Sequence, residues 1–353
     1  MKKAYEQKFR FSFSPRSAVV MKAPHGNYAR FANLQEITPA TGLKEMHGGR
    51  ISINAARKIR NAIEWLLASA AEKYVYSKKT KRFHKWKLSF LTLTLPTQGN
   101  KTDEEIKSIL NSFLTLAKYN YGLRSYIWKA EPQRRGVIHF HITSDCYMWK
   151  NSVRFEWNRL LSKSGLLNQH QDAPSTKIHS TYRVKNMAAY LTKYFIKPPT
   201  PFTKPPYLPR FGGLAISFRG NPDIGYEIPT TLFYIRPISG RLWGCSHSLS
   251  QARSLSYTVD IPEMRSMNDD LRQAGTKEKQ KSHCNFHILP DDYYKNLSHG
   301  QLKHDYLAHL LKIRKRKNLH QFEIYGEDGE QVADKKILAK FDKQYKPNHH
   351  GKS

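Results

Sequence analysis

The sequence predicts an α+β fold: a ferredoxin-like core with an antiparallel sheet and its helices on one face, plus extensions at both ends of the chain. Two observations carry this prediction. Between residues 86 and 197, segments with the period of strands and segments with the period of helices follow one another in the order β-α-β-β-α-β-α, which is typical of a ferredoxin-like sheet. The chain of 353 residues is also long enough to place further segments around a core of that size.

Each element of the core has its own signal. Residues 86–96 (WKLSFLTLTLP) alternate and end in proline, so we expect a strand there. Thr102 and Glu105 have the spacing of a capping box, which begins a helix. Residues 125–131 and 137–143 are predicted to be two strands joined by a short turn. The later elements are a helix at 152–163, a strand at 176–183 and a helix at 185–197.

The segments around the core differ from it in texture. One helix is expected at 52–73, because apolar residues recur there on one face, and another amphipathic helix is expected at 301–317. Six prolines between residues 198 and 209 exclude a continuing helix. We therefore expect four parts: an N-terminal extension at 1–85, the core at 86–197, a proline-rich linker with a small β-rich extension at 198–258, and a basic, partly helical or disordered region at 259–353.

The charge of the chain indicates an acidic partner. Lys and Arg number 59 against 28 Asp and Glu, which gives a formal net charge of +31. The chain also has 20 Tyr, 17 Phe and 6 Trp, so cations that neutralise phosphates stand among rings that stack on bases. This composition favours single-stranded nucleic acid as the partner, although a basic ribosome-associated or merely solvated surface would have a similar composition.

Cysteine usage and hydropathy bear on the compartment. The three cysteines are widely spaced and odd in number, which argues against a disulfide framework and for a reducing environment. No apolar run approaches the roughly 20 residues of a membrane-spanning helix, and no signal-peptide pattern follows the first residues. We expect a cytoplasmic protein of a bacterial cell with no membrane partner.

A metal site is predicted on the hairpin of the core. His139 and His141 alternate along a strand, so both imidazoles point to the same face of the sheet. With Gly136 in a short loop, Glu131 on the partner strand would lie directly opposite His139. Two imidazoles and one carboxylate with open positions suit Mg²⁺ or Mn²⁺ better than a closed zinc site. Half-buried sheet histidines would give the same pattern.

A pair of tyrosines is predicted on the last helix of the core. Tyr190 and Tyr194 are four residues apart, so their phenols lie on one helical face, with Lys193 and Lys197 along its flank. A phenol with a pKa near 10 is a poor nucleophile at neutral pH, and nearby ammonium groups or a metal-activated phosphate would compensate. Core packing is the alternative explanation of this spacing.

Taken together and in this order, the two patterns resemble the HUH endonucleases, and in particular the two-tyrosine replication initiators of single-stranded-DNA phages and rolling-circle plasmids. The resemblance covers residues 86–197. It rests on the first-strand motif Leu91-Thr92-Leu93-Thr94, on His139-Phe140-His141, and on the helical motif YLTKYFIK that begins at Tyr190.

The resemblance implies a metal-dependent endonuclease that nicks single-stranded DNA at a replication origin. His139, His141 and Glu131 would hold the metal, and one tyrosine would form a 5′-phosphotyrosine link and leave a free 3′-hydroxyl for priming. The second tyrosine would cleave the regenerated origin, so that the ends are rejoined. Lys193 would neutralise charge at the phosphate, and the further expected DNA contacts are Lys197, Arg134 and Arg135.

Alternatives remain open at this level. Relaxases of the same superfamily place the tyrosine before the histidines, and its transposases are usually much shorter, so an initiator is favoured over both. The runner-up from another class is a non-catalytic protein that binds single-stranded nucleic acid on a ferredoxin-like sheet. The sequence has no phosphate-loop motif, so DNA unwinding would need a separate host helicase.

Overall fold

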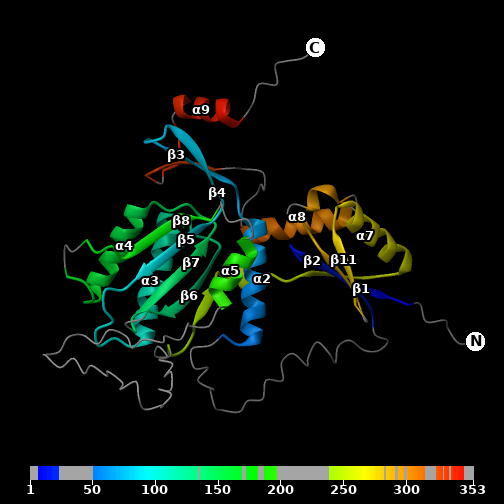
Figure 1. Cartoon of the computed structure of the whole chain (residues 1–353), viewed down its shortest axis with the longest axis horizontal. Coiled ribbons are helices and arrows are strands. Elements are labelled where there is room, and N and C mark those ends of the chain that lie inside the picture. Colours follow the sequence, from blue (N-terminus) through cyan, green and yellow to red (C-terminus); the bar gives the residue numbers. More distant parts are fainter. Residues whose placement is uncertain are drawn as a thin grey trace, which may run out of the picture.

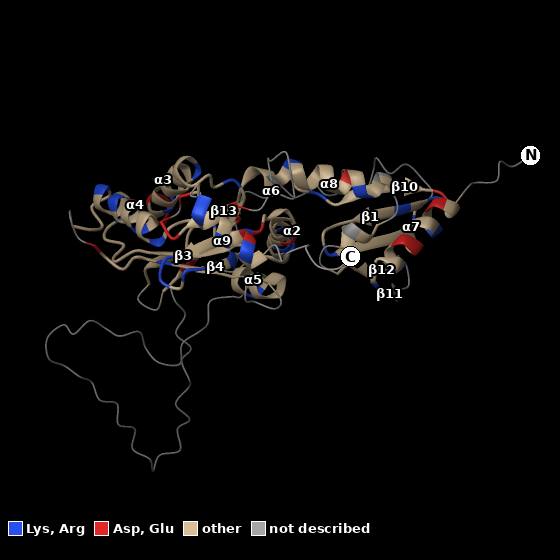
Figure 2. Ribbon diagram, turned by 90° about the horizontal axis from the view of Figure 1, so that it is seen from above, with Lys and Arg blue, Asp and Glu red and all other residues tan. Residues whose placement is uncertain are grey.

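The computed structural model describes residues 7–23, 51–133, 136–168, 172–181, 187–196, 238–281, 284–290, 293–297, 300–314, 323–328, 330–333 and 335–345. These residues form two five-stranded sheets and one three-stranded sheet. The core sheet and the second five-stranded sheet lie side by side, with α2 (Ile53–Ser69) between them, and the three-stranded sheet lies above the core (Figures 1 and 2). The predicted α+β, ferredoxin-like fold is confirmed.

The core contains the predicted elements in the predicted order. They are β5 (Ser89–Thr94), α3 (Asp103–Asn120), β6 (Tyr126–Pro132), β7 (Ile138–Ser144), α4 (Lys150–Lys163), β8 (Thr176–Ser180) and α5 (Met187–Ile196). The capping box of α3 is present, since Thr102 Oγ1 accepts from the backbone N–H of Glu105 and Glu105 Oε2 accepts from that of Thr102. The strand order is β8-β5-β7-β6-β9, because β9 (Trp243–Cys245) pairs with β6 from far along the chain.

The two faces of the core sheet carry different helices. Leu91 and Leu93 of β5 lie on the face that packs against α3 and α4, together with Phe140 of β7. Phe90 and Ile127 lie on the opposite face, in one cluster with residues of α5 and α2. The predicted single helical face therefore holds for α3 and α4, whereas α5 packs over the other face. Because strand side chains alternate, α5 lies on the face to which His139 and His141 point.

The second five-stranded sheet joins the two ends of the chain. Its order is β10-β1-β2-β12-β11, and all of its pairs are antiparallel. The helices α7 (Ile261–Gln273) and α8 (Gly300–Arg314) share an apolar cluster with its inner face, and α8 lies where the helix at 301–317 was predicted. The strands are β1 (Phe9–Phe13), β2 (Ser17–Lys22), β10 (Leu255–Val259), β11 (Lys277–Lys281) and β12 (Cys284–Ile288).

The three-stranded sheet forms a small unit with the last helix. It consists of β3 (Lys73–Ser77), β4 (Arg82–Trp86) and β13 (Glu323–Gly326), covered by α9 (Lys335–Tyr345). The rings of Tyr74, Tyr76, Phe83 and Phe341 form its core. The predicted helix at 52–73 thus ends at Ser69, and the start of the predicted strand at 86–96 belongs to β4. Short helices at His247–Gln251 (α6) and Tyr293–Asn296 (η2) complete the described chain. None of the described helices is long and apolar enough to span a membrane.

Candidate metal centre and tyrosine helix

The β6–β7 hairpin sets the register of the candidate site. Glu131 lies directly opposite His139, as predicted, and Lys129 lies opposite His141. The turn is closed by hydrogen bonds from the backbone N–H of Gly136 to the carbonyl of Gln133 and from the N–H of Gln133 to the carbonyl of Val137. Gly136 has φ +81°, a conformation that a side chain would strain. The glycine therefore helps to fix the pairing that brings the three side chains together.

The three predicted ligands converge on one point. Glu131 Oε2 lies 3.3 Å from Nε2 of His141 and 3.7 Å from Nε2 of His139. One ligand atom from each side chain lies within 4.8 Å of the others, and these residues are the one group of this kind in the described part of the chain. Nε2 of His139 is buried and has no hydrogen-bond partner. An orphaned imidazole nitrogen beside a carboxylate fits a divalent cation, which would satisfy both.

Two neighbouring side chains orient the imidazoles. Thr92 Oγ1 lies 3.2 Å from Nδ1 of His141, and the side-chain amide of Gln133 lies 3.2 Å from Nδ1 of His139. Both histidines are thus engaged at Nδ1 and direct Nε2 toward Glu131. Partners of this kind fix the ring orientation of metal-binding histidines.

The electrostatics of the three residues match the protonation states that a metal requires. Burial by itself would raise the pKa of Glu131, but the imidazoles of His139 and His141 and the ammonium group of Lys129 outweigh it, so that this pKa is lowered. Burial lowers the pKa of His141, and His139 adds to the effect while Glu131 opposes it. At neutral pH the site therefore offers a charged carboxylate and a neutral imidazole, the forms that bind metals.

The tyrosine pair lies on the same face of the sheet. The ring centroids of Tyr190 and Tyr194 are 4.8 Å apart, and both rings contact Phe90 of β5. The ring of Tyr194 also lies 6.0 Å from that of His141, and this residue is 41% exposed. Burial, and then the neighbouring Tyr194, raise the pKa of Tyr190 to about 12. Tyr194 is thus the tyrosine that stands beside the candidate metal ligands and is open to solvent.

Lys129 is a site residue that the sequence analysis missed. It is only 5% exposed, and its Nζ donates to the backbone carbonyl of Tyr194 at 3.1 Å. This carbonyl belongs to the last turn of α5, where helical partners run out. The ammonium group therefore ties the tyrosine helix to the strand that carries Glu131. The available signal was the spacing K-A-E, which puts Lys129 and Glu131 on one face of a strand.

The other predicted contacts are not brought to the site in the same way. Lys193 is exposed on α5. Lys197, Arg134 and Arg135 lie outside the described residues.

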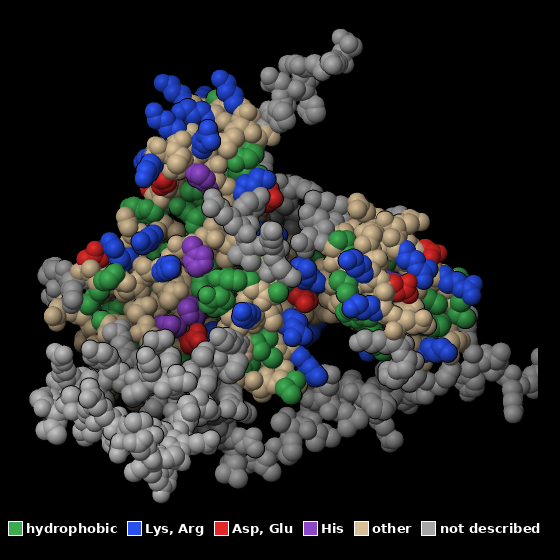
Figure 3. Space-filling view, in the orientation of Figure 1, with side chains coloured by type: hydrophobic (Ala, Val, Ile, Leu, Met, Phe, Trp, Pro, Cys, Tyr) green, Lys and Arg blue, Asp and Glu red, His purple; other side chains and the backbone are tan. Residues whose placement is uncertain are grey.

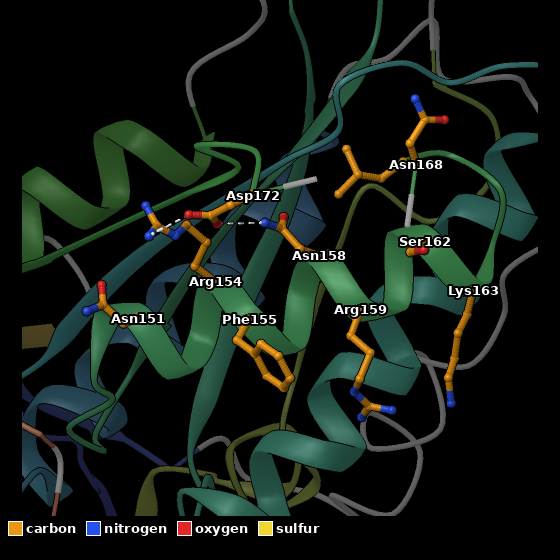
Figure 4. Close-up of a pocket in the computed structure, with 10 residues that line it drawn as sticks. Asn151, Arg154, Phe155, Asn158, Arg159, Ser162, Lys163, Asn168 and Asp172 are labelled. Atoms are coloured by element: carbon orange, nitrogen blue, oxygen red, sulfur yellow. Dashed lines mark hydrogen bonds and ion pairs between the residues drawn. The ribbon is translucent and has the colours of Figure 1, made fainter. Parts of the chain in front are cut away.

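A pocket on the outer surface of α4 is separate from this site. Its volume is about 490 Å³, and none of the metal-site residues or tyrosines lines it. Figure 4 shows that its charged groups are already paired: Arg154 forms an ion pair with Asp172 at 2.9 Å, and Asn158 donates to the same carboxylate. The pocket therefore offers no unpaired group on which catalysis could depend.

Comparison with known proteins places the similarity on this part of the chain. No curated protein and no solved structure matches the chain significantly. Residues 88–199 match the sequence model of one family, described as replication-associated proteins of the ORF2 type. The matched segment runs from the strand before Thr92 through α5, and so contains the three candidate ligands and both tyrosines. Over residues 88–199 the chain is similar to replication-associated proteins, which supports a replication initiator.

Proposed function

We propose that the protein is a metal-dependent endonuclease that nicks and rejoins single-stranded DNA at a replication origin through a tyrosine nucleophile. One observation carries the proposal. A tyrosine on α5 stands beside His141, one of three side chains that together suit a divalent metal. The similarity of residues 88–199 to replication-associated proteins supports DNA as the substrate.

The roles of the ligands follow from their chemistry. Glu131, His139 and His141 would hold Mg²⁺ or Mn²⁺. When bound, the metal would polarise an oxygen of the scissile phosphate and stabilise the charge that develops on it. Thr92 and Gln133 would keep both imidazoles aimed at that position.

The nick is a transesterification. The phenol oxygen of the tyrosine attacks phosphorus, the bond from phosphorus to the 3′-oxygen breaks, and the phenol proton is released while the leaving oxygen becomes a 3′-hydroxyl. The phosphate stays on the 5′ end and is now linked to the tyrosine. Rejoining reverses these steps, because a 3′-hydroxyl attacks the phosphotyrosine. Lys193, exposed on the same helix, would offset phosphate charge.

Tyr194 would make the first attack. Its ring contacts that of His141 and it is more open to solvent than Tyr190. Tyr190 packs against Tyr194 and Phe90, and its raised pKa keeps its phenol protonated. Tyr190 would therefore act second, on the regenerated origin, after Tyr194 has become occupied. Unwinding would fall to a separate host helicase.

A covalent-capture assay tests the proposal. The full chain is incubated with a labelled library of single-stranded oligonucleotides and Mn²⁺, and adducts that survive denaturation are collected. We expect an adduct that disappears with EDTA, with His139→Ala and with the double change Tyr190→Phe and Tyr194→Phe. Tyr119→Phe is the matched control, because Tyr119 is an exposed tyrosine on α3, outside the site.

Two results would overturn the proposal. An adduct that persists in the double Phe variant would mean that another residue is the nucleophile. Binding of the library without any adduct would instead favour a non-catalytic protein that binds single strands.

A further inference from the structure

The unit formed by β3, β4, β13 and α9 carries a dense group of cations. Exposed Lys and Arg side chains line the β3–β4 turn and the outer side of α9, and we call this set the hairpin–α9 surface. Figure 3 shows blue side chains gathered over these elements, at the top of the molecule. The residues are Lys78, Lys79, Lys81, Arg82, Lys335, Lys336, Lys340 and Lys343.

Acidic side chains do not balance this surface. The described acids of the unit that reach solvent are Glu327, Asp328, Glu330 and Asp342. One of these, Asp328, forms an ion pair with Lys78 at 3.5 Å. Eight cations against four acids leave a net positive field, which would attract a polyanion.

The aromatic rings of the unit show which form of nucleic acid the surface suits. Tyr74, Tyr76, Phe83 and Phe341 are each at most 7% exposed, because α9 covers them. None of the exposed large apolar side chains comes from the described part of this unit. Single strands are bound largely by stacking bases on exposed rings. The surface instead offers cations alone, which suits the phosphate backbone of a duplex.

We propose that the hairpin–α9 surface binds duplex DNA through its phosphates, as a second site apart from the metal centre. The choice of DNA as the polyanion rests on the proposed function. The unit is joined directly to the core, since β4 ends at Trp86 and β5 begins at Ser89. Trp86 and Thr92 are six residues apart, at most about 20 Å along an extended chain. That is roughly six base pairs of duplex, so DNA held here would flank a single-stranded segment at the metal site.

The test removes four cations that make no interaction on which folding depends. The variant combines Lys79→Gln, Lys81→Asn, Lys335→Gln and Lys343→Gln; asparagine is used because Lys81 has φ +51°. The control combines Lys150→Gln, Lys163→Gln, Lys277→Gln and Lys279→Gln, which are exposed and lie on α4 and β11. Both variants lose the same charge, so they separate a local surface from net charge.

Binding to a fluorescent duplex of arbitrary sequence is followed by anisotropy between about 50 and 200 mM salt. We expect the hairpin–α9 variant to lower affinity at least about tenfold and to reduce the slope of log K against log salt by about 3 to 4, or about 0.9 for each phosphate that is no longer neutralised. The control should bind like the unchanged protein. An equal loss in both variants, or an equal loss of single-strand binding, would overturn the proposal, as would preference for an RNA duplex of the same length.

Nicking of single-stranded oligonucleotides is measured on the same samples. We expect the hairpin–α9 variant to nick at the unchanged rate, because its four positions lie outside the metal site and α5. If the unchanged protein forms no covalent adduct, the proposed function fails, while duplex binding by this surface can still be scored.

Discussion

Lys129→Met removes the ammonium group that holds α5 and keeps the apolar stem of the side chain. A hydrogen bond from a charged donor contributes about 1.5–3 kcal/mol. Removing the charge also relieves the cost of burying it, so global stability should change little. The bond acts on the last turn of the helix that carries Tyr194, so its loss falls on the alignment of that tyrosine with His141. At 1.36 kcal/mol for each factor of ten, we expect kcat for nicking to fall about 10- to 100-fold.

The assay is single-turnover nicking, together with Mn²⁺ titration and urea unfolding. Because Lys129 places a positive charge near the carboxylate of Glu131, Lys129→Met should bind Mn²⁺ at least as tightly as the unchanged protein. Lys129→Arg, which keeps a donor, should recover part of the rate, and Lys163→Met on exposed α4 is the control. A rate within about twofold of the unchanged protein would refute the positioning role, since a lost 1.5 kcal/mol predicts about tenfold. A parallel collapse of stability and rate would show a merely structural role.

Two further predictions concern the hairpin and its histidine. Gly136→Ala should destabilise the protein by about 1–2 kcal/mol in urea unfolding, because φ +81° is strained for alanine and its Cβ meets no neighbour; a neutral effect would contradict the predicted strain. The lowered pKa of His141 makes the metal-free protein lose stability as the pH falls from the unfolded-state value near 6.5 toward the folded-state pKa, because the unfolded chain takes up the proton first. Urea unfolding at pH 7.5 and 5.5 should show a smaller loss in His141→Gln than in the control His84→Gln on exposed β4, and equal losses would count against this sign.

Much of the core was predictable because its signals are local. Alternation fixed the shared face of His139 and His141, and the short glycine turn fixed Glu131 opposite His139, as the register confirms. Helical spacing likewise placed Tyr190 and Tyr194 together. In each case the geometry depends on residues within one hairpin or one helix turn.

The remaining features depend on pairing between distant segments. The short strand β9 has too few residues to show alternation, yet it completes the core sheet against β6. Similarly, β1 and β2 find their partners β10 and β12 at the other end of the chain. The period of α5 does not say which face of the sheet it covers. Lys129 would be expected in solvent, and only the placement of α5 shows that it is buried.

The central claim is that α5 presents a tyrosine to a metal held by Glu131, His139 and His141. The most direct test is mass spectrometry of the peptide that remains linked to DNA after a single turnover with Mn²⁺. We predict that the nucleotide is attached to Tyr194, and that it moves to Tyr190 or disappears in Tyr194→Phe. Attachment to a residue outside α5, or an unchanged yield of adduct in His139→Ala without added metal, would contradict the claim.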